Sequence, residues 1–310
     1  MPNETILERR ATPRQARARE RVESILVAAR DIIEHEGVEP LSTQRIAKVA
    51  GSRSYALKGR LALLEMAIIR YSLDKLLAKN FELISVPAMA REFAFTGSGH
   101  FPTGREQVYH LPEDDIFLAG TAEVPVNALH AGEMLDEKQL PILYGGVSAC
   151  FRREAGSYGK DVRGLNRLHQ FDKVEIVQIA HPEKSYQILE EMRAHVAGLL
   201  RELELPFRIL KLCGGDMSFA SALTYDFEVY SAAQQKWLEV SSVSNFESFQ
   251  ANRLKLRFKD EKGKPQLAHT LNGSSLALPR IVASLLENNQ TATGIKLPAV
   301  LHPYFGASSI

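Results

Sequence analysis

Apolar residues recur at steps of three and four in several stretches of the chain, which is the periodicity of an amphipathic helix. Three of these stretches stop at helix-ending residues, namely Gly37, Gly51 and Pro206. The spacing therefore predicts helices at about 16–36, 42–51, 60–79, 183–205 and 274–289.

After Pro102 the pattern changes to short apolar runs that are rich in β-branched and aromatic residues. The runs are DIFLAG, PILYGGVSACF, KVEIVQIA, FRILKLC, YDFEVYSA, KWLEVSSVS and LAHTL. Most are joined by segments too short for a helical crossover, so their strands should pair antiparallel. Together, the two patterns predict an α+β fold in which an antiparallel sheet is flanked by helices.

Composition narrows the class of protein. The chain has 310 residues, of which 45% are hydrophobic and 24% charged, with a net charge of +1. Its two cysteines, Cys150 and Cys213, form no disulfide or metal-binding pattern, as expected in a reducing compartment. No apolar run approaches the ~18 residues of a membrane span, and the N-terminus lacks the apolar core of a signal peptide. We therefore expect a cytoplasmic protein with no membrane partner.

An unusual density of charge lies between two of the predicted strands, at 149–175. Arg152 and Glu154 are two residues apart, and the returning strand carries Phe171, Lys173 and Glu175 at the same spacing. Period-two alternation would direct each set to one face of the sheet. Arginine suits a phosphate and phenylalanine can stack on a base. The stretch is thus either a nucleotide-binding hairpin or a surface hairpin with solvated ion pairs.

The same stretch resembles motif 2 of class II aminoacyl-tRNA synthetases. FRREAGSYGKDVRGLNRLHQFDKVE matches, without gaps, the pattern FRxEAGSxGxDxRGLxRxHQFxKxE of the seryl-tRNA synthetases. Further similar segments follow the family's order: VAGSRSYALKG, FTGSGHFP, TAEVPVNAL, CGGDMSFASALTYDFEVY, WLEVSSVSNFESFQANR and HTLNGSSLALPRIVASLLENNQ. The resemblance covers about 46–306, so it implies a class II catalytic domain at 46–310.

The resemblance implies that serine is activated with ATP and Mg²⁺ to seryl-adenylate and then transferred to tRNA. Arg152 would hold the α-phosphate and Arg280 the γ-phosphate, and these two residues with Glu239 would be catalytic. Glu154 and Phe171 would hold the adenine. Glu239 and Ser242 would contact ATP and its Mg²⁺.

The resemblance also implies a serine site. The ammonium group of serine would be received by Thr121, Glu123 and Glu175, with Thr121 and Glu123 on a strand. Asn272 and Ser274 would recognise its hydroxyl end.

The chemistry itself requires no protein nucleophile, because the carboxylate of the substrate attacks phosphorus. We therefore nominate no catalytic triad and expect His169 and His269 to be structural hydrogen-bonding residues. Glu175 and Glu239 lie in apolar strands, where an unpaired buried glutamate would be costly, so each should have a cationic partner.

Three positions depart from the family pattern. Ser275 and Pro279 replace glycines beside Arg280, and Leu223 replaces a lysine. A side chain at 275 and a ring at 279 could crowd ATP. The family's long N-terminal coiled coil, which grips tRNA, has no counterpart in the residues that precede the match.

Those preceding residues resemble another family. Residues 12–51 are similar to the start of a TetR-type helix-turn-helix domain, but the recognition helix that should follow Gly51 is missing. We therefore treat 1–45 as a helical N-terminal segment. It is either a lead-in packed on the catalytic domain or a weak contact for DNA phosphates.

Three functions remain open at this point. The chain could be a seryl-tRNA synthetase-like ligase, an enzyme that activates serine for another acceptor such as a carrier protein, or a catalytically weakened paralogue with a binding or regulatory role. By the same resemblance, a homodimer is expected through 61–87, which corresponds to motif 1.

Overall fold

A computed structural model describes residues 49–156 and 165–310. The N-terminal segment 1–45, the helix expected at 16–36 and most of the helix expected at 42–51 lie outside the described residues. So does the tip of the charged hairpin, 157–164.

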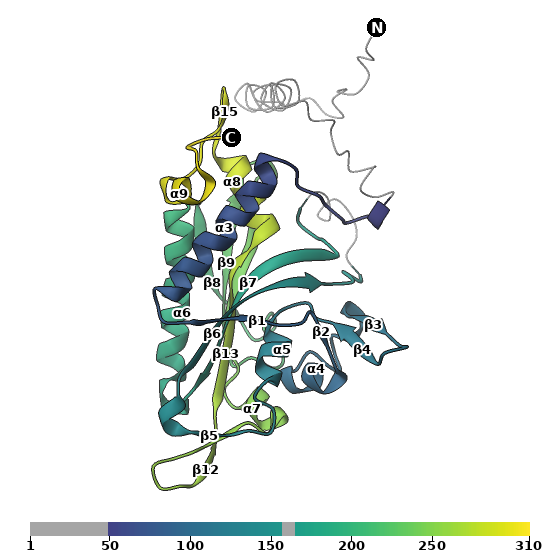
Figure 1. The fold of residues 1–310 in the computed structure, drawn as a ribbon, viewed down its shortest axis with the longest axis vertical. Helices are drawn as coiled ribbons and strands as arrows, with labels where there is room; N and C mark the ends of the chain where they lie inside the picture. Colours follow the sequence, from purple (N-terminus) through teal and green to yellow (C-terminus); the bar gives the residue numbers. More distant parts are fainter. Residues whose placement is uncertain (1–48, 157–164) are drawn as a thin grey trace.

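A seven-stranded sheet forms the centre of the molecule (Figure 1). Its strands, in spatial order, are β1 (Glu82–Ser85), β6 (Ile142–Phe151), β7 (Gln170–Ala180), β13 (His269–Ala277), β10 (Lys236–Asn245), β9 (Leu223–Ser231) and β8 (Phe207–Lys211). All neighbouring strands pair antiparallel except β1, which runs parallel to β6 at the edge. The predicted α+β fold with a largely antiparallel sheet is confirmed.

Three helices cover one face of this sheet: α3 (Arg60–Leu77), α6 (Ser185–Glu202) and α8 (Leu278–Asn288) (Figure 1). Their apolar stripes pack on the sheet in the main core, which includes Leu64, Ile68, Leu189, Met192, Val196, Ile281 and Leu285. Burying each such side chain contributes roughly 1.5–3 kcal/mol.

The helix expected at 274–289 begins later than predicted. Residues 269–277 instead form β13, which pairs with β7 on one side and β10 on the other. Pairing on both edges satisfies the backbone groups of this segment and overrides its local helical spacing. The helix then begins at Leu278, with Pro279 in its first turn, where the missing N–H costs nothing.

The opposite face carries α4 (Glu92–Ser98), α5 (Glu123–Ala128) and α7 (Phe249–Leu254). Two three-stranded sheets lie beside these helices (Figure 1), and their strands are β2 (Met89–Ala90), β3 (Tyr109–Leu111), β4 (Ile116–Leu118), β5 (Met134–Asp136), β11 (Arg257–Lys259) and β12 (Pro265–Leu267). The chain ends with β14 (Gln290–Thr291), β15 (Gly294–Ile295) and α9 (His302–Phe305).

Successive side chains of β7 point alternately to the two faces of the central sheet. Val174 and Ile176 belong to the main core beneath the helices. Lys173, Glu175 and Val177 point to the other side, where Val177 packs against α5. No helix among the described residues is long and apolar enough to cross a membrane.

Candidate active site

Two adjoining cavities open on the face of the sheet opposite α3 and α6. The first, of about 100 Å³, is lined by Arg152, Arg167, Arg280, Glu154 and Phe171 among others, and we name it the arginine cavity. The second, of about 460 Å³, is lined by Thr121, Glu123, Lys173, Glu175 and Asn272 among others, and we name it the carboxylate cavity. The residues that border both are Arg152, Lys173, Glu239 and Ser274.

All eleven residues proposed from the sequence line one or both cavities. In the arginine cavity are Arg152, Glu154, Phe171, Glu239, Ser274 and Arg280. In the carboxylate cavity are Thr121, Glu123, Arg152, Glu175, Glu239, Ser242, Asn272 and Ser274.

Backbone carbonyl groups hold Arg280 in the arginine cavity. Its Nε and Nη2 donate to the carbonyl of Asn166 at 3.2 and 3.0 Å, and its Nη1 donates to the carbonyl of Glu239. Burial lowers the pKa of the guanidinium from its ordinary value, but an arginine so supplied with acceptors stays charged. Because its partners are neutral, the positive charge is left for a ligand.

Arg152 reaches the same cavity from the end of β6. Its Cζ lies 5.2 Å from the centre of the Phe171 ring, and its Nε donates to the carbonyl of Gly120 at 3.3 Å. A Cβ atom on Gly120 would lie only 3.3 Å from Cγ of Arg152, so glycine at this position leaves room for the arginine side chain. Two arginines from distant segments therefore share one cavity, as the sequence predicted.

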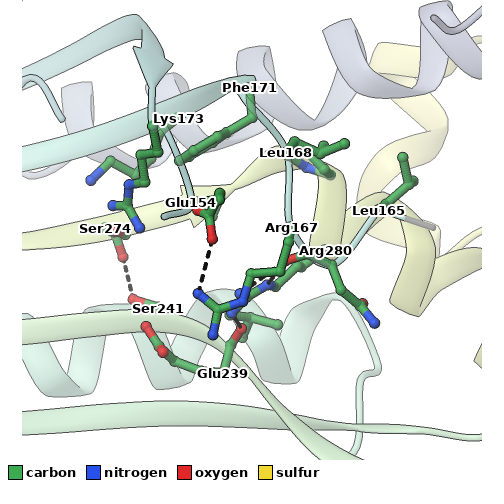
Figure 2. A pocket seen from close by; sticks show the side chains of 15 residues that line it. Glu154, Leu165, Arg167, Leu168, Phe171, Lys173, Glu239, Ser241, Ser274 and Arg280 are labelled. Atoms are coloured by element: carbon green, nitrogen blue, oxygen red, sulfur yellow. Dashed lines mark hydrogen bonds and ion pairs between the residues drawn. The ribbon is translucent and has the colours of Figure 1, made fainter. Parts of the chain in front are cut away.

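Glu154 faces the arginine cavity, but not for the predicted reason. Strand β6 ends at Phe151, and Glu154 has a left-handed backbone with φ of 50°, so strand alternation does not orient it. The turn instead buries its side chain, whose Oε2 lies 3.3 Å from Nη1 of Arg167 (Figure 2). A non-glycine residue with positive φ is strained and is held there by its surroundings.

Arg53 supplies part of that support. Its Nη1 donates to the carbonyl of Glu154 at 2.9 Å, while its own carbonyl accepts from the backbone N–H of His169 at 3.0 Å. His169 in turn pairs through Nδ1 with the carbonyl of Arg152 at 3.0 Å. His169 is thus a structural hydrogen-bonding residue, as expected, and so is His269, whose Nδ1 lies 2.8 Å from Oγ of Ser185.

A buried ion pair lies at the base of the carboxylate cavity. Nζ of Lys173 contacts Oε2 of Glu175 and also donates to Oγ1 of Thr121 at 2.8 Å. The expected cationic partner of Glu175 is therefore confirmed. Burial raises the pKa of the Glu175 carboxyl, and the ammonium of Lys173 opposes that rise.

Glu123 is the second buried carboxylate of this cavity. It was expected on a strand, but it is the first residue of α5, with Thr121 just before the helix. Gln250 donates to its Oε1 at 2.6 Å, and Nε2 of His100 lies 4.0 Å from its Oε2. Burial raises the pKa of Glu123, and hydrogen bonds from Gln250 and Asn272, together with the charge of Lys173, oppose that rise.

Glu239 differs from the prediction. Its side chain is exposed where the two cavities meet rather than buried with a cation. Ser242, on the same strand, hydrogen-bonds Asp226, whose pKa is raised to about 6, chiefly by burial. No group of three or more His, Cys, Asp or Glu in the described part of the chain is arranged to hold a metal. A carboxylate and a hydroxyl are nevertheless oxygen donors of the type that Mg²⁺ accepts together with substrate phosphates.

The three departures from the family pattern lie in different surroundings. Ser275 is fully buried at a β-bulge between Ser274 and Leu276, and it points away from both cavities. Its Oγ lies 2.8 Å from Oγ of Ser72 on α3 and 3.2 Å from Nε2 of His195 on α6. The expectation that serine at 275 would crowd the site is therefore wrong, because the bulge turns this side chain toward the helices.

Pro279 does line the arginine cavity. Leu223 begins β9 and packs against the main core, and it borders neither cavity.

Sequence reasoning gave no role to Lys173, Gln250, Arg167 or Arg53. Period-two spacing already placed Lys173 between Phe171 and Glu175, and that signal could have identified it. Gln250 had no such signal, because its partners come from segments far away in sequence.

The comparisons with known proteins agree with this geometry. The chain matches the model of the tRNA synthetase class II core domain (G, H, P, S and T) over residues 108–289. It is 50% identical over 269 residues to a serine--tRNA ligase of Chlorobaculum parvum, covering 86% of this chain and 63% of that relative. It is 46% identical over 283 residues to the Deinococcus radiodurans serine--tRNA ligase, covering 90% of this chain and 66% of that relative.

Solved structures give the same result. Seryl-tRNA synthetase from Pyrococcus horikoshii complexed with ATP superposes with a TM-score of 0.86 at 38% identity, covering 94% of this chain and 63% of that chain. Giardia lamblia prolyl-tRNA synthetase, at 13% identity and a TM-score of 0.75, shares the fold. The chain belongs to the class II tRNA synthetase core domain family.

Proposed function

We propose that this chain activates serine with ATP, forming seryl-adenylate and pyrophosphate, and transfers the seryl group to tRNA. The chain spans 63% of the first of its serine--tRNA ligase relatives, and the proposal concerns the reaction of the whole protein. One observation supports it above the others: a cavity lined by three arginines opens directly onto a cavity with two buried carboxylates.

The arginine cavity suits the nucleotide. Arg152 and Arg280 are fixed by neutral groups, so both can bind phosphate oxygens with planar, bidentate geometry. Phe171 offers a ring on which adenine can stack, and the backbone and carboxylate of Glu154 can contact its amine. In this reaction a carboxylate oxygen of serine attacks the α-phosphorus, a new O–P bond forms, and the bond to the bridging oxygen of pyrophosphate breaks.

The carboxylate cavity suits the ammonium group of serine. It buries two carboxylates, Glu123 and Glu175, against one ammonium, that of Lys173. The two buried carboxylates therefore outnumber the one buried ammonium, which favours a cationic ligand, with Thr121 beside it. Asn272 and Ser274 border the same cavity and would hydrogen-bond the hydroxyl group. An analogue without a hydroxyl would leave such groups unpaired.

Glu239 and Ser242 would hold a Mg²⁺ ion together with the phosphates of ATP, where the two cavities meet. When bound, the ion would neutralise charge that develops on the phosphate oxygens.

We also propose that the protein acts as a homodimer. Large apolar side chains are exposed along α3 and the edge strand β1, namely Leu63, Met66, Leu77 and Leu83, with Met66 65% exposed. A second copy covering this surface would bury them. Met66→Asp should shift the mass measured by light scattering from dimer to monomer, and a wild-type mass equal to the monomer would reject the proposal.

Serine-dependent exchange of labelled pyrophosphate into ATP tests the activation step. We expect exchange with serine and roughly 10²-fold or more less with alanine. Folded protein that shows no exchange at saturating serine would contradict the activation step and would favour a binding or regulatory role. Transfer of labelled serine to tRNA, compared with carrier proteins, then tests the acceptor.

A further inference from the structure

Gln250 is a fully buried amide behind the carboxylate cavity, at the second position of α7. All of its polar contacts are made within the protein. Nε2 donates to Oε1 of Glu123 at 2.6 Å and to the carbonyl of Ser98 at 2.9 Å. Oε1 accepts from Nδ2 of Asn127 at 3.0 Å and from Oγ1 of Thr270 at 2.7 Å.

These partners fix the orientation of the amide. A carboxylate and a backbone carbonyl can only accept hydrogen bonds, so the NH₂ group must face Glu123 and Ser98. Reversing the amide would place its oxygen against two acceptors in a buried site, which is costly. Four elements or loops meet at this side chain, so its position is determined by the fold.

We propose that Gln250 is a positioning residue for the serine site, an inference that rests on the proposed function. Its NH₂ group occupies Oε1 of Glu123, which leaves Oε2 directed toward the cavity, where His100 lies at 4.0 Å. Gln250 borders neither cavity, and Glu123 is the charged cavity residue through which it reaches the serine site.

The same hydrogen bond favours the charged form of Glu123. The charged and titratable groups around Glu123 are Lys173 and Glu175 on β7, Arg152 at the end of β6, and His100 after α4. Burial raises the pKa of Glu123, and the donor from Gln250 is the foremost of the contributions that oppose it. Since an ammonium ligand needs an ionised carboxylate, loss of this donor should weaken serine binding most at low pH.

Two variants of Gln250 test this through opposite pH dependences. Gln250→Met removes the donor, so the pKa of Glu123 should rise further, and kcat/KM for serine should fall roughly 10-fold or more near neutral pH and recover as pH rises. Gln250→Glu keeps the shape, and its carboxyl can share one proton with Glu123. This variant should therefore be most active at low pH and should lose activity as the second carboxyl ionises.

Pyrophosphate exchange with the full chain, measured from pH 6 to 8.5 with KM for serine and ATP determined separately, gives the readout. Asn245→Leu is the control, because Asn245 is an equally buried amide whose bonds go to Ser185 and to the backbone of Glu247. It should lower thermal stability without altering the pH profile for serine. Opposite slopes for the two Gln250 variants, with the KM for ATP within about 3-fold of wild type, would support the inference.

Two results of the exchange assay would overturn it. One is a wild-type pH profile in both Gln250 variants. The other is an equal rise of KM for serine and ATP, which a loss of structure alone would produce. If wild-type protein shows no exchange, the proposed function fails, and calorimetric titration with serine alone decides the inference. Equal serine affinity in wild type and Gln250→Met, or no serine binding at all, would overturn it as well.

Discussion

The charged side chains of the arginine cavity and those of the carboxylate cavity are held in place by different kinds of groups. In the arginine cavity Arg152 and Arg280 are held by neutral backbone carbonyls, those of Asn166, Glu239 and Gly120, while Arg167 pairs with Glu154. In the carboxylate cavity the charges are deeply buried and are held by other side chains, Lys173 and Gln250. The first arrangement leaves positive charge available, whereas the second compensates most of its charge internally.

Because of this difference, we expect substitutions in the two cavities to have separate effects on ligand binding and on the stability of the fold. Arg152 is exposed, so removing a side chain of this kind should affect the ligand and little else. Removing one member of a buried pair leaves the other without compensation, so the fold should suffer too. The two cavities should therefore respond differently to substitution.

The largest effect on activity is expected from Arg280→Ala. Loss of one preorganised charge at developing negative charge costs roughly 10²–10³-fold in kcat. Unfolding in urea should change little, because the partners of Arg280 are backbone carbonyls beside the cavity. Arg193→Ala on α6, which removes an exposed arginine paired with Glu190, is the matched control. A wild-type exchange rate in Arg280→Ala would show that the arginine cavity does not bind the reacting phosphates.

The largest effect on stability is expected from Glu175→Gln. It leaves the ammonium of Lys173 buried without its carboxylate, which costs about 3–5 kcal/mol in free energy of unfolding. Glu190→Gln, at an exposed carboxylate, should cost at most ~1 kcal/mol. Urea denaturation compares the two. Replacing both members, Lys173→Met with Glu175→Leu, should restore much of the stability but no serine binding.

An intermediate effect on stability is expected when the pH is lowered, through a histidine on the helix-covered side of the sheet. Burial lowers the pKa of His195 to about 4, from an ordinary value near 6.5. The unfolded chain therefore binds a proton that the folded chain excludes, so stability is lost as pH falls from 6.5 toward 4, by up to about 1.4 kcal/mol per pH unit. Burial lowers the pKa of His100 as well, so two histidines contribute with the same sign to the dependence of stability on pH. His195→Gln should reduce the slope in urea denaturation at pH 7, 6 and 5, and an unchanged slope would contradict this assignment.

The smallest effect is expected from Ser275→Gly. It removes contacts with Ser72 and His195 and should cost roughly 1 kcal/mol of stability. Kinetic constants in the exchange assay should stay within about 2-fold of wild type, because the side chain points away from both cavities. Ser274→Ala, one residue away, should instead raise the KM for serine. A marked gain of activity in Ser275→Gly would show that serine at 275 does impair the site.

Local spacing was sufficient where partners are close in sequence. Phe171, Lys173 and Glu175 line the cavities because they alternate along one strand, and α3 and α6 follow their apolar stripes. The same reasoning failed for Glu154, the strand that the resemblance implied for Glu123 was wrong, and spacing also misplaced the start of α8. A left-handed turn, a helix and a doubly paired strand replaced the simple strand or helix expected there.

The sequence by itself determined the family, the antiparallel sheet and eleven of the residues that line the two cavities, because these depend on motifs and on periodicity within single segments. Only the tertiary structure decided that Ser275 faces the helices, that Glu239 is exposed and that Gln250 holds Glu123. Each of these depends on which distant segment supplies a hydrogen-bond partner or leaves space, and that choice is made when the sheet, helices and loops pack together.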